Sequence, residues 1–406
     1  MQRLAILSYH TSPLVQPGSG DGGGMNVYVR ELASALAQAG IACDVYTRAT
    51  DPLDPSEVDV EPGVRVHNVG AGPPSPLPRE ELPAHLEEFG DRVAARLGDA
   101  PPDVLHANYW LSGVVGHRLK HELDLPLVST FHTLARVKAD IDIHEPAGRA
   151  AAEARVIECS DAICVSCDDE AIQLRTLYDA DPSRIEVAPP GVLHAFFSPG
   201  DQAGARRAVG LGAGPVLLFV GRIQPLKGLD VAVEALALLR SDRLPDARMV
   251  VVGGPSGPEG PAELERVKAI VERLGLDDAV RFVPPQPHHV LSTWYRAVDV
   301  CVVPSRSESF GLVALEAAAC GTPVVAAAVG GLRTLVDHGR TGLLVEDRHP
   351  AAYAAALSTV LERPDRARVM GREGADRATA YTWSTTAARL RRLYADLAQR
   401  APVPCR

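Results

Sequence analysis

Apolar runs of strand length alternate with amphipathic stretches of helix length along most of this 406-residue chain. In the first half, the strand-like runs are RLAILSYH, ACDVYTR, DVLHAN, PLVSTFHT and AICVSC, and VYVRELASALAQAG has helical spacing between the first two. Strands that alternate with helices are typical of a parallel sheet covered on both faces. The first half is therefore predicted to be α/β, with loops and short strands in the proline- and glycine-rich residues 51–83.

A second series of the same kind starts at residue 215, with PVLLFVGR, LDVAVEALALLR, ARMVVVGG, AVRFVPP, DVCVVP and PVVAAAVGG. Between the two series, residues 189–201 (PPGVLHAFFSPGD) have the proline and glycine content of a hinge. The pattern predicts an α/β fold of two Rossmann-like domains facing across a cleft. The expected domains are 1–195 and 196–375, with a helix in 376–406 packing back on the first.

Composition restricts the class of protein. The chain is 46% hydrophobic and 23% charged, and its formal net charge of −10 argues against nucleic acid or an acidic membrane as its main partner. The amino terminus has too short an apolar core for a signal peptide, and no run reaches the ~20 residues of a membrane span. We expect a cytoplasmic protein that holds any anionic substrate with local positive charge.

The seven cysteines are an odd number, which fits a reduced compartment. Cys159, Cys164 and Cys167 have the C-x4-C-x2-C spacing of some iron–sulfur ligands. However, AICVSC is expected to be a buried strand in which Cys164 and Cys167 point to opposite faces. We interpret the three as small buried core residues.

Residues 304–331 carry the most informative chemistry in the chain. The apolar run before Pro304 and the run that ends in paired glycines predict a strand, a helix and a strand, which is one βαβ unit. Glu308 is then expected in the loop after the first strand, and Glu316 on the helix. Two carboxylates at the ligand-binding edge of a parallel sheet would repel phosphate, so sugar hydroxyls are their expected partners.

A glycine-rich loop lies between the first strand and the first helix. Gly22, Gly23 and Gly24 would let the backbone approach a ligand, and the helix amino terminus would offer N–H donors to a phosphate. A dinucleotide site is the rival interpretation, but there is no GxGxxG and the next strand ends in Thr47-Arg48 in place of an acidic residue.

Two further loops carry polar side chains directly after predicted strands. In VGRIQPLKG, Arg222 and Lys227 together suit a diphosphate whose charge grows as a glycosidic bond to it breaks. In STFHTLARVK, His132 is expected to bind a sugar hydroxyl and Thr133 a phosphate oxygen. No residue in the sequence stands out as a nucleophile for covalent catalysis.

With these motifs together, the chain resembles the retaining family 4 glycosyltransferases of GT-B fold over nearly its whole length. The general family features are GRIQPLKG, ESFGLVALE and the GG after TPVVAAAV. SYHTSPLVQPGSGDGGGMNVYV, ANYWLSG, FHTLARVK, VVGGPSG and FVPPQ are similar to the D-inositol-3-phosphate glycosyltransferases of actinobacteria, which open mycothiol synthesis. The resemblance implies transfer of N-acetylglucosamine from UDP-GlcNAc to an inositol phosphate hydroxyl.

The resemblance also implies roles for individual residues. The amino-terminal domain would bind the acceptor and the second domain the nucleotide sugar. The implied catalytic residues are His132, Arg222, Lys227 and Glu308. The implied donor-binding residues are Gln16, Pro17, Gly24, Arg222, Lys227, Glu308 and Glu316. The implied acceptor-binding residues are His10, Asp21, Gly22, Gly23, Gly24, Met25, Asn26, Arg79, Tyr109, Thr133 and Arg149.

The same resemblance implies that no cofactor is required for catalysis. A structural Mg²⁺ ion is implied at Tyr295, Arg296, Val298 and Thr322, mostly through main-chain oxygens. The expected partners are a nucleotide sugar and a small phosphorylated acceptor, without nucleic acid or a membrane span. Relatives are often homodimers, which makes a homodimer a further expectation.

The sequence departs from the family pattern on the acceptor side. Arg79 stands where the family has Lys, the hinge lacks the usual Asp after PGV, and residues 139–150 look unlike the family. A related transferase with another nucleotide sugar and another polar or phosphorylated acceptor, in natural-product biosynthesis, therefore stays open. A UDP-GlcNAc 2-epimerase-like isomerase is a further alternative, although Arg79 and Arg149 argue for a second, anionic substrate.

Overall fold

The computed structural model describes residues 2–18, 20, 22–99, 101–141 and 145–405, and it divides into two compact units. Unit 1 contains Met1–Val15, Met25–Pro189 and Trp383–Arg406, and unit 2 contains Gln16–Gly24 and Pro190–Thr382. The chain therefore leaves unit 1 at Pro189, a few residues before the expected boundary at 195, and returns to it at Trp383. The glycine-rich loop groups with unit 2, although it follows the first strand of unit 1.

Unit 1 is built on an eight-stranded sheet in which β3 and β4 are antiparallel and the other neighbours are parallel. In spatial order its strands are β3 (Glu57–Glu61), β4 (Val64–Val69), β2 (Ala42–Arg48), β1 (Arg3–Leu7), β5 (Val104–Asn108), β6 (Leu127–Thr130), β7 (Ala162–Val165) and β8 (Ile185–Val187). The predicted α/β pattern and the short strands within 51–83 are confirmed. Every residue of β5, β6 and β7 is buried, as expected for strands covered on both faces.

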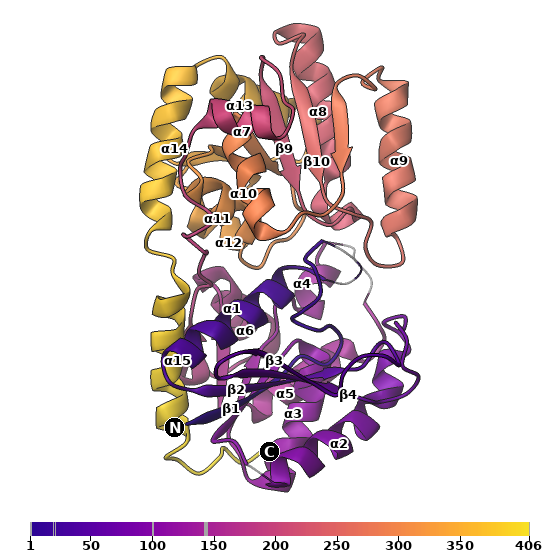
Figure 1. Ribbon diagram of the computed structural model, residues 1–406, viewed down its shortest axis with the longest axis vertical. Coiled ribbons are helices and arrows are strands. Elements are labelled where there is room, and N and C mark those ends of the chain that lie inside the picture. Colours follow the sequence, from indigo (N-terminus) through magenta and orange to yellow (C-terminus); the bar gives the residue numbers. More distant parts are fainter. Residues whose placement is uncertain (1, 19, 21, 100, 142–144, 406) are drawn as a thin grey trace. The chain divides into compact units, whose positions relative to one another are not determined.

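The helices of unit 1 cover this sheet. They are α1 (Gly24–Gln38), α2 (Leu86–Asp99), α3 (Trp110–Leu123), α4 (Ala135–Ala139), α5 (Arg149–Cys159), α6 (Asp168–Tyr178) and α15 (Trp383–Leu397), with short 3-10 turns at Leu82–His85 and Pro182–Arg184. The yellow α15 runs beside the indigo and purple elements of unit 1 in Figure 1. It is fixed there because the Tyr394 hydroxyl bonds His106 Nδ1 at 2.7 Å and Thr386 donates to the Pro189 carbonyl at 2.6 Å.

Unit 2 has a six-stranded, fully parallel sheet. Its strands in spatial order are β11 (Val280–Val283), β10 (Arg248–Val252), β9 (Val216–Val220), β12 (Val300–Val303), β13 (Val324–Ala327) and β14 (Gly342–Val345). Numbered from the start of the unit, this order is 3-2-1-4-5-6, the order of a Rossmann sheet. Leu217 and Phe219 of β9 enter one buried cluster and Leu218 enters another, because successive side chains of a strand point to opposite faces.

Helices cover both faces of this second sheet. They are α7 (Gln202–Ala208), α8 (Leu229–Asp242), α9 (Gly260–Arg273), α10 (His288–Ala297), α11 (Leu312–Ala319), α12 (Gly331–Leu335), α13 (Pro350–Leu361) and α14 (Pro364–Ala378), preceded by a 3-10 turn at Pro225–Lys227. The two-domain α/β fold expected from the sequence is confirmed. Among the described helices, none is both long enough and apolar enough to cross a bilayer.

The cysteines differ from the sequence expectation in two respects. Cys159 is the last residue of α5 and is bonded to Cys405 in the segment after α15, so it is not simply a core residue. Cys167 lies beyond β7, at the start of α6, so it and Cys164 do not share one strand. Cys164 and Cys167 are buried thiols, as expected.

Candidate functional site

In each of the two sheets, the polar loops follow the strands between which the strand order reverses. In unit 2, β9 pairs with both β10 and β12, so the order of the strands reverses between β9 and β12. In unit 1, β1 pairs with both β2 and β5, and the order reverses in the same way. Ligands of open α/β sheets bind at the carboxyl ends of the strands on either side of such a reversal. The loops after β9 and β12 carry Lys227 and Glu308, and those after β1 and β5 carry His10 and Tyr109.

Lys227 and Glu308 meet at this edge of unit 2. Lys227 Nζ donates to Glu308 Oε2 at 2.6 Å, and Ser305 Oγ lies 3.2 Å from the same oxygen. Both side chains of the ion pair keep about a fifth of their surface exposed. Lys227 ends the 3-10 turn directly before α8, so an anion beside it would also face backbone N–H groups of a helix amino terminus.

The paired glycines after β13 hold the Glu308 loop in place. Gly331 N donates to the Glu308 carbonyl at 3.0 Å. A Cβ on Gly330 would lie 2.0 Å from that carbonyl oxygen, and Gly330 has a φ of +46°. Glycine is therefore needed here for close backbone approach. The sequence singled out this pair, and the structure explains it through Glu308.

Glu316 lies on α11, as predicted, and its side chain is buried. The Tyr295 hydroxyl donates to Glu316 Oε2 at 2.9 Å, and His288 Nε2 is 4.0 Å from Oε1. Burial raises the pKa of Glu316 to about 7, against a smaller lowering from the Tyr295 hydrogen bond. A carboxyl group of this kind both donates and accepts hydrogen bonds near neutral pH, which suits a ligand with hydroxyl groups. Tyr295 as the partner of Glu316 was missed, because the two are 21 residues apart in sequence.

The glycine-rich loop packs on unit 2. Gln16 Nε2 donates to the Gln286 carbonyl at 2.9 Å, and Gly18 N donates to Gly22 O at 2.9 Å. A Cβ on Gly23 would lie 3.2 Å from Arg222 Nε, so the loop brings its backbone against that guanidinium. Pro17 and Gly24 lie in the same stretch, whereas Asp21 lies outside the described residues.

In unit 1, His132 follows β6 in a left-handed backbone conformation, with a φ of +59°. Its Nε2 lies 2.9 Å from Asn108 Oδ1, and its ring packs edge-on to Tyr28 at 4.9 Å. Burial, with smaller contributions from His106 and His10, lowers the pKa of His132 to about 3. The imidazole is therefore neutral at physiological pH. Because Asn108 Oδ1 accepts only, Nε2 is the donor and Nδ1 the acceptor of the ring.

Arg149 is the centre of a polar cluster in unit 1. Its guanidinium is fully buried and donates to Glu153 Oε1 at 2.7 Å and to Glu145 Oε2 at 2.5 Å. It also donates to the Thr133 hydroxyl at 3.0 Å and lies over the Tyr109 ring at 4.9 Å. The structure thus brings together three of the acceptor-side residues that the sequence suggested: Tyr109, Thr133 and Arg149.

The same cluster contains side chains that sequence reasoning missed. Lys138, at 9% exposure, donates to Glu145 Oε1 at 2.5 Å. Burial and Arg149 lower the pKa of Lys138, Glu145 raises it, and Arg79 lowers it further, so Arg79 acts on the same cluster. The cluster therefore contains three cations and two carboxylates. The cations are Arg79, Lys138 and Arg149, and the carboxylates are Glu145 and Glu153. Lys138 is the last residue of the FHTLARVK motif, and its place five residues after Thr133 in the same motif was the available signal.

The remaining acceptor-side residues lie near the start of unit 1. The His10 and Tyr109 rings are 4.4 Å apart. Asn26 is buried and donates to the Thr11 hydroxyl at 2.7 Å, so its amide fixes the chain after β1. Met25 opens the part of α1 that belongs to unit 1.

The positions suggested for magnesium are Tyr295, Arg296, Val298 and Thr322, around the carboxyl end of α10. Thr322 Oγ1 donates to the Tyr295 carbonyl at 2.7 Å, and Gln202 Nε2 donates to the Val298 carbonyl at 2.9 Å. Arg206 Nε donates to the Ala297 carbonyl between them, also at 2.9 Å. A guanidinium at this place disfavours a divalent cation. The residues do not fit a magnesium site, and we derive no step through an ion.

Comparison with known proteins agrees with the two α/β units and their polar loops. Residues 23–191 match the Glycosyl transferase 4-like domain, and residues 205–377 match Glycosyl transferases group 1. A protein of Kribbella flavida named D-inositol 3-phosphate glycosyltransferase is 49% identical over 95% of this chain and 94% of its own. The chain belongs to the D-inositol 3-phosphate glycosyltransferase family. Membership makes it a glycosyltransferase and decides against the isomerase alternative and the dinucleotide site.

Solved structures place this glycosyltransferase in the GT-B fold. Sucrose-phosphate synthase from Thermosynechococcus elongatus is 35% identical, with a TM-score of 0.92 over 98% of this chain and 99% of its own. Anabaena HepE, solved in complex with UDP-glucose, has a TM-score of 0.78 at 18% identity over 98% of this chain and 100% of its own, a likeness of fold alone.

Proposed function

We propose that the protein is a retaining glycosyltransferase that transfers N-acetylglucosamine from UDP-GlcNAc to 1D-myo-inositol 3-phosphate, the first step of mycothiol biosynthesis. The observation that carries this proposal is the cationic cluster of buried Lys138 and Arg149 and half-buried Arg79 in unit 1. The relatives of this chain are named for inositol 3-phosphate. A neutral acceptor would not need three cations beside one another.

In the donor half, Lys227 and Arg222 bind the diphosphate, and the backbone of Gly23 and Gly24 approaches it closely. Glu316 accepts hydrogen bonds from the uridine ribose. Glu308 binds hydroxyl groups of the sugar. The support for these roles is that Lys227 lies before a helix amino terminus and that Glu308 is held beside it.

In the acceptor half, Arg149 and Thr133 bind the phosphate, with Arg79 and Lys138 adding positive charge. Glu145 now bonds both Lys138 and Arg149 with its two oxygens, as a phosphate would. His10 and Asn26 line the inositol side. His132, being neutral, binds a sugar hydroxyl and does not act as a cation.

The reaction proceeds on the front face of the sugar. The leaving diphosphate takes the proton of the attacking inositol hydroxyl as the bond between the anomeric carbon and the diphosphate oxygen breaks. The anomeric carbon passes through an oxocarbenium-like state, and configuration is retained. Lys227 and Arg222 stabilise the charge that grows on the diphosphate, so the protein contributes positioning and electrostatic stabilisation. No metal ion takes part in these steps.

The test is UDP release from UDP-GlcNAc with 1D-myo-inositol 3-phosphate, with unphosphorylated myo-inositol and without acceptor. We expect release only with the phosphorylated acceptor. Equal release with myo-inositol would contradict the role of the cationic cluster. If only a different sugar phosphate supports release, the acceptor assignment is wrong while the transferase assignment stands, which is the second possibility that the unusual residues 139–150 keep open.

A further inference from the structure

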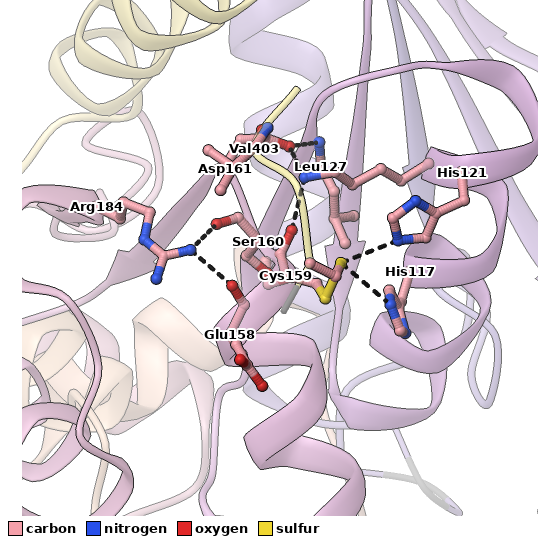
Figure 2. Close-up of polar contacts among 12 residues, drawn as sticks. His117, His121, Leu127, Glu158, Cys159, Ser160, Asp161, Arg184 and Val403 are labelled. Atoms are coloured by element: carbon pink, nitrogen blue, oxygen red, sulfur yellow. Dashed lines mark hydrogen bonds and ion pairs between the residues drawn. A yellow bond between two sulfur atoms is a disulfide. The ribbon is translucent and has the colours of Figure 1, made fainter. Parts of the chain in front are cut away.

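Two histidines and two cysteines gather on the surface of unit 1, away from the loops after β1 and β5. His117 and His121 are one turn apart on α3, Cys159 ends α5, and Cys405 lies in the segment after α15. One ligand atom from each of the four lies within 4.8 Å of every other. Figure 2 shows both imidazoles pointing at the sulfur pair from the same helix.

The distances match the scale of a tetrahedral metal site. His121 Nε2 is 2.9 Å from Cys405 Sγ, and His117 Nε2 is 3.5 Å from it. Zinc bonds of about 2.1 Å to nitrogen and 2.3 Å to sulfur separate tetrahedral ligand atoms by roughly 3.5 Å. Histidines four residues apart on a helix point the same way, which is how helices present paired metal ligands.

Hydrogen bonds of Asp161 and Lys120 hold the backbone segments that carry the two cysteines. Asp161 accepts from Leu127 N and Lys120 Nζ, each at 2.7 Å, and from Val403 N at 2.6 Å. Lys120 also donates to the Cys159 carbonyl at 2.7 Å. One buried carboxylate therefore ties the segment that carries Cys405 to the end of α5 (Figure 2). Such supporting bonds orient the ligands of structural metal sites.

We propose that His117, His121, Cys159 and Cys405 bind one Zn²⁺ ion that fastens the C-terminal segment to α3 and α5. Two thiolates and two imidazoles are the ligand set of closed structural zinc sites. Four protein ligands leave no position for water or substrate, so the ion stabilises unit 1 and takes no part in sugar transfer.

The metal and the disulfide exclude each other, because the bond joins the sulfurs that bind zinc. Opening the Cys159–Cys405 bond takes two electrons and two protons, which a dithiol supplies as it closes to its own disulfide. The two thiols then lose their protons as zinc binds. The zinc form is therefore the reduced form of this site.

The test uses the full chain, reduced with a dithiol, freed of it under argon and incubated with zinc. We expect one zinc ion per chain after gel filtration, measured by mass spectrometry of the metal. Substituting Co²⁺ should give the visible bands of a tetrahedral ion and a sulfur-to-cobalt charge-transfer band. Cys405→Ser and His121→Ala should each abolish stoichiometric retention, and the Val403 amide, which donates to Asp161, should then exchange hydrogen faster.

Two control variants remove the same residue types elsewhere. His289→Ala removes an exposed histidine of unit 2, and Cys43→Ala removes a buried thiol of β2, so both should retain one zinc ion. Cys405 lies outside the helices and strands, so Cys405→Ser leaves both cores intact. Absence of zinc from the reduced wild-type chain, or retention unchanged in Cys405→Ser, would overturn the proposal and leave only a disulfide.

Discussion

The Lys227 ammonium donates to the Glu308 carboxylate at 2.6 Å in unit 2. The two residues are 81 positions apart, and they meet because β9 and β12, which precede them, are neighbours in the sheet. The pair joins the cation proposed for the diphosphate to the carboxylate proposed for the sugar. A diphosphate must therefore compete with Glu308 for Lys227.

Lys227→Ala is expected to lower turnover by about 10² to 10³-fold, because one donor to the leaving diphosphate is lost. The measurement is kcat from UDP release at saturating substrates. Lys268→Ala, which removes an exposed lysine from α9, serves as the control and should leave kcat unchanged. Near wild-type turnover in Lys227→Ala would remove this residue from the mechanism.

Glu308→Gln is expected to tighten UDP binding while transfer falls. The variant removes the charge that competes for Lys227, and the pair is partly exposed, so a gain of about two- to fivefold in affinity is expected. Calorimetric titration with UDP measures the affinity. Weaker UDP binding would show that Glu308 assists the diphosphate instead of competing with it.

Stability should fall as pH rises through the range set by Glu316. Burial raises its folded-state pKa from 4.5 to about 7, so the unfolded chain releases this proton at lower pH than the folded chain. Between these values the folded state binds more protons, and ionisation costs on the order of 3 kcal/mol of unfolding free energy by pH 8. Urea unfolding at pH 5 and pH 8 should show the loss in wild type and a smaller one in Glu316→Gln. Glu265→Gln, on exposed α9 surface, should follow wild type.

Gly330→Ala is expected to destabilise unit 2 by roughly 3 kcal/mol or more, because its Cβ would meet the Glu308 carbonyl and its φ is positive. Gly339→Ala isolates the conformational part: its φ is +82° but nothing lies within 4 Å of a Cβ there, so a loss of about 1 kcal/mol is expected. Thermal unfolding compares the two. Equal losses of unfolding free energy in the two variants would show that the Glu308 loop moves to accommodate the methyl group without destabilising unit 2.

Arg79→Gln is expected to raise the KM for the phosphorylated acceptor by about 10-fold or more, with the KM for the nucleotide sugar unchanged. The residue is half-buried and its charge acts on Lys138, so its removal weakens the cationic cluster. Arg92→Gln, an exposed arginine of α2, is the matched control. A rise in the KM for the sugar donor alone would contradict the assignment of Arg79 to the acceptor site.

The sequence predicted those parts of the site that local pattern determines. Apolar runs located β9, β12 and β13, and therefore the loops of Lys227 and Glu308, because strand length and flanking glycines are local signals. The glycine pair after β13 was also visible, since close backbone approach requires glycine. Family resemblance, and not physics, supplied the names of the donor and the acceptor.

Contacts between distant segments could not be predicted from sequence. Tyr295 next to Glu316, and Lys138 sharing Glu145 with Arg149, depend on how helices pack, which leaves no periodic trace. The burial of Glu316 was also missed, because a glutamate near the start of a helix is usually solvated. The Cys159–Cys405 bond spans 246 residues, and no local spacing connects the two.

The proposed transfer is tested most directly by the mass and anomeric configuration of the product formed from UDP-GlcNAc and 1D-myo-inositol 3-phosphate. We expect a product heavier than the acceptor by one N-acetylhexosamine residue, with an α-anomeric proton coupling that shows retention. An inverted linkage, or free N-acetylhexosamine with unchanged inositol phosphate, would contradict it.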